Sequence, residues 1–359
     1  MERLLFLSFA AFLFLVTACD SSTNGTDDDG PMLPSFDRKA MLEGWANDVI
    51  IPAYEANVIT SSQLVTSASS FIGSPNPEQL ASLRADYQTA YLSWQSLSPF
   101  MMGRAEEINL RFRVNTYPTN TKLIEQTIAG GNFNLELPSL ITAQGFPALD
   151  YLLYADADQL LENGPAASDR REYIAALTVT LRDLIASAGS ERTPAFVTVY
   201  TQNDGNSATA SVDRMVNDYI FHYEKFLRAG KVGIPAGVFS DTLLADRAEA
   251  LYSSQSKELF LASLSTSETF FNDNGLAEYL NALNVIRDGE LLSAKVTNQF
   301  AAIRITSENV GENFSDQVID DNVQMLTLYD EMQRLVVLLK VDMLQALSIN
   351  VDYVDADGD

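Results

Sequence analysis

The stretch from Gln144 to Tyr154, QGFPALDYLLY, places a single acid, Asp150, inside an otherwise apolar run. A carboxylate in that setting can bind a cation or take part in acid–base chemistry, or it can stabilise the first turn of a helix. Proline suits the first helical position and keeps the preceding residue, Phe146, extended. The pattern therefore predicts a helix that begins at Pro147 with Asp150 as a helix-start residue, and leaves a ligand-binding role as the alternative.

A second candidate is His222, the only histidine of the chain, with Asp218 one helical turn before it. Such a pair can hold a metal ion or set up a general base. The same predicted helix face carries apolar residues that favour a place beside the core, where Asp218 would accept the proton of His222. These residues are Met215, Tyr219 and Phe226.

The segment KVGIPAG, which begins at Lys231, combines a cation with turn-forming residues. Gly230 is expected to end a helix, Gly233 and Gly237 to permit backbone turns, and Pro235 to fix the chain. Loops with these residues on a rigid scaffold often line binding sites. A purely mechanical loop and a loop that brings Lys231 into a cleft both remain open.

Composition limits the chemistry further. Cys19 is the only cysteine, and if it carries lipid no thiol remains for disulfides, thiolate metal sites or nucleophilic catalysis. The net charge of −25 would repel a phosphate backbone, so nucleic acid is not expected as a partner. Cations or a basic protein partner would be attracted.

The first residues are typical of a bacterial lipoprotein signal. Arg3 precedes an apolar run from Leu4 to Val16, and the sequence LVTAC ends at Cys19. We expect residues 1–18 to be removed and Cys19 to anchor the chain in the cell envelope. The expected location is the outer membrane, on its periplasmic face or on the cell surface.

Residues 19–35 contain little that a core could bury, and we expect a flexible acidic tether. Asp27, Asp28 and Asp29 within it resemble surface-export signals of some Bacteroidetes lipoproteins, although they lie farther from Cys19 than in that pattern.

From the tether onwards, apolar residues recur at helical spacing and strand-like alternation is nearly absent. The sequence predicts an all-α fold of two packed helical bundles of about four helices each, divided near the polar stretch 201–209 into residues 36–203 and 204–359. A kink is expected at Pro52. The predicted helical segments are Lys39–Asn57, Glu78–Met101, Thr119–Ala129, Pro147–Tyr154, Asp169–Ser187, Ser211–Ala229, Lys257–Phe271, Leu276–Leu283, Glu290–Ser307 and Met325–Met343.

Several stretches, in this order, resemble the imelysin-like family of bacterial envelope proteins. The resemblance implies two helical bundles with a functional site at their junction, in proteins that are secreted or lipid-anchored. That family was first described as peptidases, and relatives are associated with iron uptake. The stretches are SWQSLSPFMMG (93–103), Tyr117-Pro118, QGFPALDYLLY (144–154), KVGIPAG (231–237) and ALYSSQSK (250–257).

The family's hallmark, Gly-x-His-x-x-Glu, maps onto Gly145 to Asp150, where Pro147 replaces the histidine and Asp150 the glutamate. Residues three apart on a helix share one face, so a histidine and a glutamate there could reach one metal ion. Proline offers no ligand atom, and a lone carboxylate is a poor transition-metal site. The expected junction site comprises Gly145, Pro147, Asp150, Lys231, Gly233 and Pro235, with Asp150, Asp218 and His222 as the weak candidates for iron or another divalent metal.

Three functions follow from these residues. The first is a lipid-anchored, non-catalytic protein that binds a ligand or an envelope partner, linked to iron acquisition. The second is a metal-dependent peptidase whose site has moved to His222, Asp218 and carboxylates of the other bundle. The third is a structural or interaction module of the envelope.

Overall fold

The computed structural model describes residues 36–131 and 133–353, and these confirm the predicted all-α fold. The one sheet among them is a short antiparallel hairpin in which β1 (Ile286–Arg287) pairs with β2 (Glu290–Leu291). No helix in the described ranges is both long and apolar enough to cross a bilayer. Cys19, the predicted signal peptide and the predicted tether lie outside the described residues.

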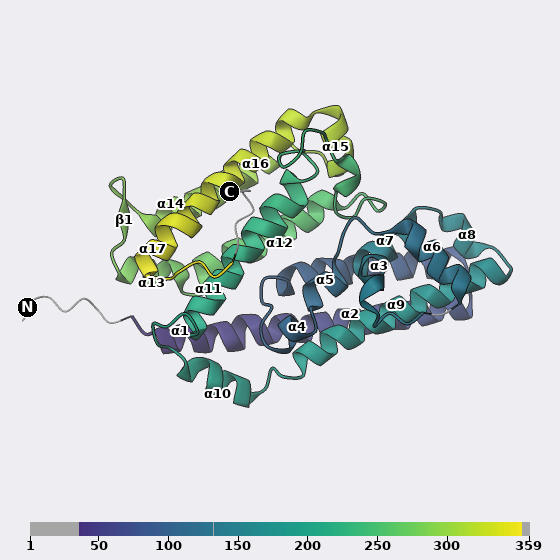
Figure 1. The fold of residues 1–359 in the computed structure, drawn as a ribbon, viewed down its shortest axis with the longest axis horizontal. Coiled ribbons are helices and arrows are strands. Elements are labelled where there is room, and N and C mark those ends of the chain that lie inside the picture. Colours follow the sequence, from purple (N-terminus) through teal and green to yellow (C-terminus); the bar gives the residue numbers. More distant parts are fainter. Residues whose placement is uncertain (1–35, 132, 354–359) are drawn as a thin grey trace, which may run out of the picture. The chain divides into compact units, whose positions relative to one another are not determined.

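Three long helical rods organise the first part of the chain. The first rod joins α1 (Arg38–Gly44), a π-helical turn η1 (Trp45–Ile50) and α2 (Ile51–Gly73). Both α3 (Pro77–Leu97) and α9 (Pro165–Gly189) pack along α2 (Figure 1). Shorter elements lie between or after them: α4 (Arg104–Glu107), α5 (Leu110–Val114), α6 (Thr121–Gly130), η2 (Pro138–Ala143), α7 (Gly145–Tyr154), α8 (Ala157–Leu161) and α10 (Pro194–Gln202).

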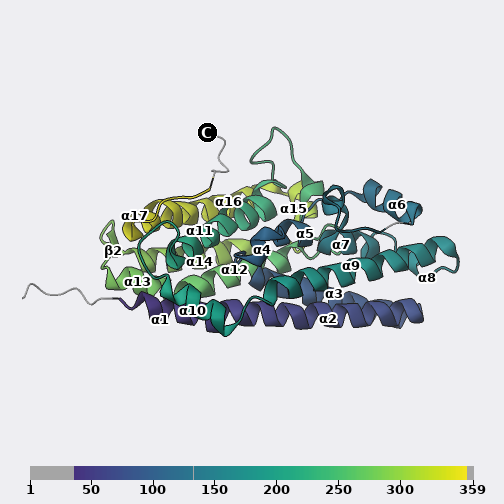
Figure 2. The same cartoon turned by 60° about the horizontal axis from the view of Figure 1, so that its bottom comes forward.

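The second part of the chain is built around α12 (Ser256–Asp273), α14 (Leu292–Ser307) and α16 (Asn322–Val336), with α14 and α16 in extensive contact. A further rod, α11 (Ser211–Phe221) continued by the π-helical η3 (His222–Gly233), packs on α16 and α12. Figure 2 shows these helices from another side. The remaining elements are η4 (Ala245–Arg247), α13 (Leu276–Ala282), α15 (Phe314–Asp320), η5 (Val337–Met343) and α17 (Leu344–Leu347).

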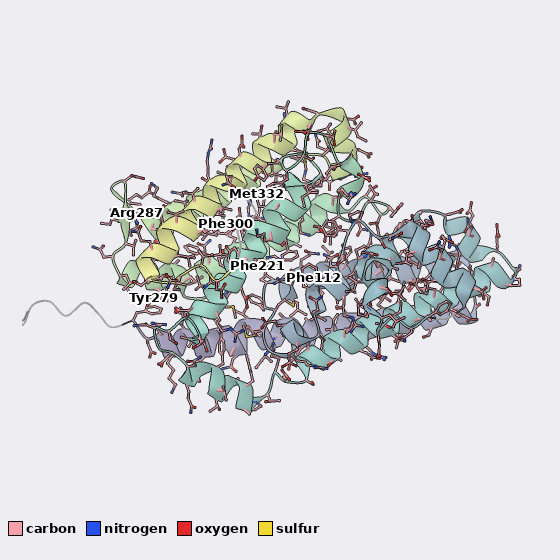
Figure 3. The ribbon with its side chains drawn as sticks, in the orientation of Figure 1. Phe112, Phe221, Tyr279, Arg287, Phe300 and Met332 are labelled. Carbon is pink, nitrogen blue, oxygen red and sulfur yellow. The ribbon has the colours of Figure 1, made fainter. Side chains whose placement is uncertain are left out.

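The two parts meet through a contact between helices and through a group of aromatic rings. Helix α3 contacts α12 directly. The ring of Phe112, in α5, lies 5.9 Å from that of Phe226, and the ring of Phe221 lies 5.6 Å from that of Phe226. Phe112 and Phe221 are labelled in Figure 3. The Arg111 guanidinium stacks 4.5 Å from the centre of the Phe226 ring. The boundary predicted between residues 203 and 204 falls in the loop between α10 and α11, and the division into two bundles stays a prediction.

Three local expectations differ from the structure. Helix α7 begins at Gly145, two residues before Pro147. The helix expected to end at Gly230 continues as η3 to Gly233, so Lys231 is helical and not part of a loop. The rod that contains Pro52 extends to Gly73, past the predicted end at Asn57, and the π-helical turn η1 lies directly before the proline. The kink at Pro52 stays a prediction.

Candidate functional site

The carboxylate of Asp150 joins α7 to a segment 102 residues further along the chain. Its Oδ2 accepts a hydrogen bond from the backbone N–H of Tyr252 at 2.8 Å, and its Oδ1 accepts one from the N–H of Ser253 at 3.1 Å. The Tyr87 hydroxyl lies 3.4 Å from Oδ1. Asp150 is only 2% exposed, so these donors replace water around a charge that would otherwise be costly to bury.

This arrangement corrects the expectation that Asp150 is a helix-start residue. Asp150 is the sixth residue of α7, and no acid lies in the first turn. Burial raises the pKa of Asp150, and hydrogen bonds from Ser253 and from the Tyr252 amide oppose that shift. The carboxylate therefore serves a tertiary contact rather than the helix dipole.

Gly145, the first residue of the family hallmark, is required by the backbone. Its φ of +76° belongs to the left-handed region, and a Cβ placed there would lie 2.2 Å from the Val114 carbonyl oxygen. A side chain at this position would push α7 away from the end of α5. The hallmark glycine thus has a structural reason that does not depend on the missing histidine.

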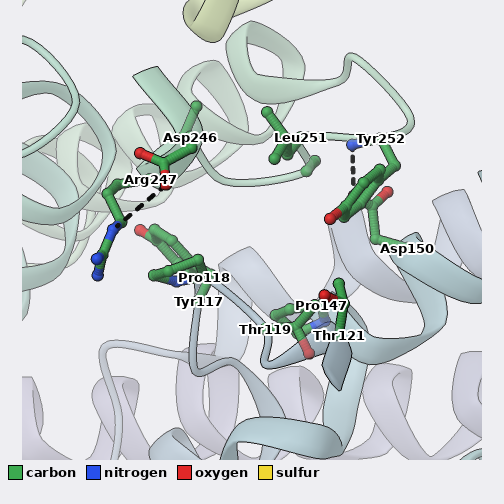
Figure 4. Close-up of a pocket in the computed structure, with 12 residues that line it drawn as sticks. Tyr117, Pro118, Thr119, Thr121, Pro147, Asp150, Asp246, Arg247, Leu251 and Tyr252 are labelled. Carbon is green, nitrogen blue, oxygen red and sulfur yellow. Dashed lines mark hydrogen bonds and ion pairs between the residues drawn. The ribbon is translucent and has the colours of Figure 1, made fainter. Parts of the chain in front are cut away.

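A cavity of about 240 Å³ opens beside Asp150 (Figure 4). Pro147 and Asp150 line it from α7, and residues 117–121 and 246–252 form its other walls. It therefore draws on both the first and the second part of the chain. The lining residues are Tyr117, Pro118, Thr119, Thr121, Pro147, Asp150, Asp246, Arg247, Ala248, Ala250, Leu251 and Tyr252.

Lys231 is buried against Glu249, with which it forms an ion pair. Glu249 also accepts hydrogen bonds from the Tyr91 hydroxyl at 3.0 Å and from the Asn115 side-chain amide at 2.7 Å. Burial lowers the pKa of Lys231, and Glu249 opposes that shift. Ala248 and Ala250, on either side of Glu249, line the cavity. The contacts of Glu249 therefore fix the position of this wall.

His222 lies in the core beside Ser98. Its Nε2 is 2.8 Å from the Ser98 hydroxyl oxygen, whereas its Nδ1 has no hydrogen-bond partner among the described residues. Burial holds the pKa of His222 well below its usual range, and the charges of Arg111 and Lys231 lower it further. The hydrogen-bond partner of the ring is therefore Ser98, and not Asp218 as expected.

Asp218 is partly buried one turn before His222. Burial raises the pKa of Asp218 from 3.8 to about 7, while Arg111 and Arg214 act in the opposite direction. A carboxyl with this pKa changes charge near neutral pH. No hydrogen bond joins it to His222, so the two do not form an oriented acid–base pair.

The donors around the hallmark position do not fit a resident transition metal. Pro147 offers no ligand atom, and both carboxylate oxygens of Asp150 already accept backbone N–H groups. Within residues 36–131 and 133–353, no group of three His, Asp or Glu side chains gathers closely enough to hold a metal ion.

The structure brings Pro147 and Asp150 into one cavity, and Gly145 is buried in the same helix without lining it. Lys231 is connected to its wall through Glu249, whereas Gly233 and Pro235 do not line it. Glu249 and Arg247 were not singled out from the sequence, although they immediately precede the stretch 250–257 that carries part of the family resemblance.

The comparisons place the chain in a family. The imelysin model, which carries the designation peptidase M75, matches residues 50–341. The chain belongs to the imelysin family, and the family resemblance noted in its motifs is confirmed. A comparison with curated proteins finds no match.

Two solved structures share the fold. An imelysin-like protein from Psychrobacter arcticum 273-4 is 18% identical, with a TM-score of 0.73 over 88% of this chain and 97% of that one. A protein assigned as an iron-regulated protein A precursor from Parabacteroides distasonis ATCC 8503 is 14% identical, with a TM-score of 0.71 over 90% and 96%. At these identities the likeness concerns the fold alone.

We predict that Gly145→Ala lowers the free energy of unfolding by about 2–4 kcal/mol, the sum of a left-handed backbone and a steric clash with Val114. Chemical denaturation measures it. Gly131→Ala is the matched control, since Gly131 has a similar φ of +65° and no atom within 4 Å of the place that an added Cβ would take. Equal losses in the two variants would contradict the close-approach argument.

We predict that Asp218→Asn stabilises the protein above neutral pH. The folded-state pKa of about 7 exceeds the ordinary 3.8, so the native chain holds the extra proton between these values. Stability contributed by this group is therefore lost as pH rises from 3.8 to about 7. The unfolding free energy of the variant minus that of the parent should therefore increase as pH rises across that range. A variant that is less stable than the parent at about pH 8 would contradict the prediction.

Proposed function

We propose that this imelysin-family protein is a lipid-anchored component of the cell envelope that binds a ligand or an envelope partner without catalysis, in connection with iron acquisition. Its anchor would be Cys19, and its ligand would enter the cavity beside Pro147 and Asp150. One observation carries the non-catalytic part of the proposal. The carboxylate at the hallmark position is engaged by two backbone N–H groups, and its helical neighbour three residues earlier is a proline.

The cavity supports a binding role because its walls combine polar and apolar groups from separate parts of the chain. Arg247 supplies a cation at the rim, where its ion pair with Asp246 is long, at 3.9 Å. Tyr117, Tyr252 and the threonines at 119 and 121 offer hydroxyl groups. Pockets with a few convergent polar groups on a rigid scaffold are the usual sites for small ligands.

The envelope and iron parts of the proposal have a different basis. The lipoprotein-like start of the sequence supports anchoring in the outer membrane. The link to iron is supported by the description of the Parabacteroides distasonis neighbour as an iron-regulated protein precursor. Regulation by iron would not require that the protein itself binds the metal.

A displaced peptidase site at His222 and Asp218 has less support from the geometry. His222 is buried, its pKa is lowered well below neutrality, and its ring bonds to Ser98. A neutral imidazole enclosed in the core has no route to a peptide substrate. The interaction-module alternative differs from our proposal in needing no ligand in the cavity.

We predict that the full chain, incubated with ferrous iron or zinc and then freed of excess metal, retains far less than one ion per molecule by elemental analysis. The physical reason is the loss of the imidazole at Pro147 and the prior engagement of Asp150. The double variant Pro147→His with Asp150→Glu restores the hallmark and should retain more metal than the parent.

Stoichiometric metal in the parent chain, abolished by Asp150→Ala or by His222→Ala, would overturn the proposal. So would chelator-sensitive cleavage of a peptide library by the same preparation. An unchanged metal content in the double variant would show that Pro147 is not what limits binding.

A further inference from the structure

Exposed apolar side chains gather on the loop that follows η3 and on the first turns of α16. Leu243 is 51% exposed, Val323 66% and Phe239 42%, which is unusual for residues of this size in one neighbourhood. Val238 and Leu326 are exposed as well. We call these five residues, together with the acids around them, the acidic–apolar face.

Two contacts hold the loop after η3 against the start of α16. The side-chain amide of Asn322, at the start of α16, donates to the Ala236 carbonyl at 3.0 Å, which fixes Val323 beside the turn after η3. The Phe239 ring packs edge-on against Tyr329, 6.0 Å between centroids. Leu326 lies one helical turn before Tyr329, on the same side of α16.

The loop that carries Val238, Phe239 and Leu243 is held in shape at its base. Gly237 has a φ of +78°, and a Cβ there would lie 2.7 Å from the Thr242 carbonyl oxygen. The backbone N–H of Leu244 donates to the Pro235 carbonyl at 3.0 Å. The loop therefore presents its apolar residues from a closed base rather than from a free strand.

Acids outnumber cations around this cluster. The segments 234–246 and 311–333 contain eight acids and neither lysine nor arginine, and the two arginines that directly follow them, Arg247 and Arg334, lie beside Asp246 and Glu331 in ion pairs. Asp241, Asp320 and Asp330 are exposed within them. A cationic partner would gain from this field, whereas an anionic lipid surface or an acidic protein would be repelled.

Arg228 and Lys257, from other segments, also approach the face. Arg228 is fully buried beneath it, with its guanidinium 6.0 Å from the Phe239 ring and 3.8 Å from the Glu224 carboxylate. Lys257 lies 3.4 Å from Glu312 in an ion pair. Both positive charges are thus offset within the protein.

We propose that the acidic–apolar face is a docking surface for a basic, amphipathic helical segment of a partner protein. The exposed side chains of Leu243, Val323 and Phe239 would contact the apolar stripe of such a helix, and the surrounding aspartates its lysines and arginines. This inference rests on the proposed function only in assuming that the chain binds a partner, because it uses neither the cavity nor a metal.

The test uses the full chain and a fluorescent synthetic helix of leucine and lysine, with binding followed by anisotropy at low and at physiological salt. Leu243→Ser with Val323→Ser should weaken binding by about fivefold or more, since both side chains would be buried in the complex. Asp241→Asn with Asp320→Asn and Asp330→Asn should weaken it similarly at low salt and flatten the salt dependence.

Matched variants elsewhere on the chain separate this face from a general attraction of peptide to an acidic protein. Ile59→Ser with Ile305→Ser removes two equally exposed apolar residues, 69% and 64%. Asp158→Asn with Asp169→Asn and Glu172→Gln removes three exposed acids from the first part of the chain. Both controls should bind within about twofold of the parent.

Equal effects in the face variants and the controls would overturn the proposal, as would a failure of the parent to bind the peptide. Equal binding of a leucine–glutamate helix would show that charge does not select the partner. A dimer in sedimentation that Leu243→Ser with Val323→Ser dissociates would assign the face to a second copy of this chain. Metal content is measured on the same preparations. A parent that holds stoichiometric metal contradicts the proposed function, whereas a parent that lacks metal and does not bind the peptide contradicts only the docking proposal.

Discussion

The carboxylate of Asp150 is buried, and its two oxygens accept hydrogen bonds from the backbone of Tyr252 and Ser253. Burying a charge without partners is costly, whereas a carboxylate that receives N–H donors at both oxygens recovers much of that cost. The buried carboxylate keeps these donors only while the segment 250–253 stays against α7. The site therefore exists because a charge in the first part of the chain is satisfied by backbone from the second.

A second carboxylate holds the same segment from the other side. Glu249 is buried and contacts Lys231, Tyr91 and Asn115, so it joins η3 to α3 and to the end of α5. Between these two anchors, Ala248, Ala250 and Leu251 form one wall of the cavity. Asp150 and Glu249 thus position this wall of the cavity, and both carboxylates are already bonded to other groups of the protein.

Helical periodicity was sufficient to predict the all-α fold, since α3, α9, α12 and α16 each bury a regular apolar stripe. The predicted helix ends at Asn57, whereas α2 continues to Gly73 through a serine- and threonine-rich stretch with a weaker apolar stripe. The role of Asp150 was interpreted wrongly because its donors lie 102 residues away and are backbone groups. Composition and spacing carry no information about such a contact.

His222 illustrates the same limit, because Ser98 is 124 residues distant and any hydroxyl in the chain was an equal candidate. The prediction that Pro147 and Asp150 share a junction site had a better basis, since the family resemblance fixed the position. Gly145 has a structural role that is independent of a histidine at position 147. The close approach of α7 to Val114 requires glycine whatever the chemistry beside it.

Amide hydrogen exchange at Tyr252 and Ser253 tests the central claim most directly. If the Asp150 carboxylate holds these two N–H groups, they should be protected in the parent chain, lose that protection in Asp150→Ala, and show no change when ferrous iron is added. Protection that survives the substitution, or that iron abolishes, would mean that the carboxylate is free for another ligand and would contradict the account.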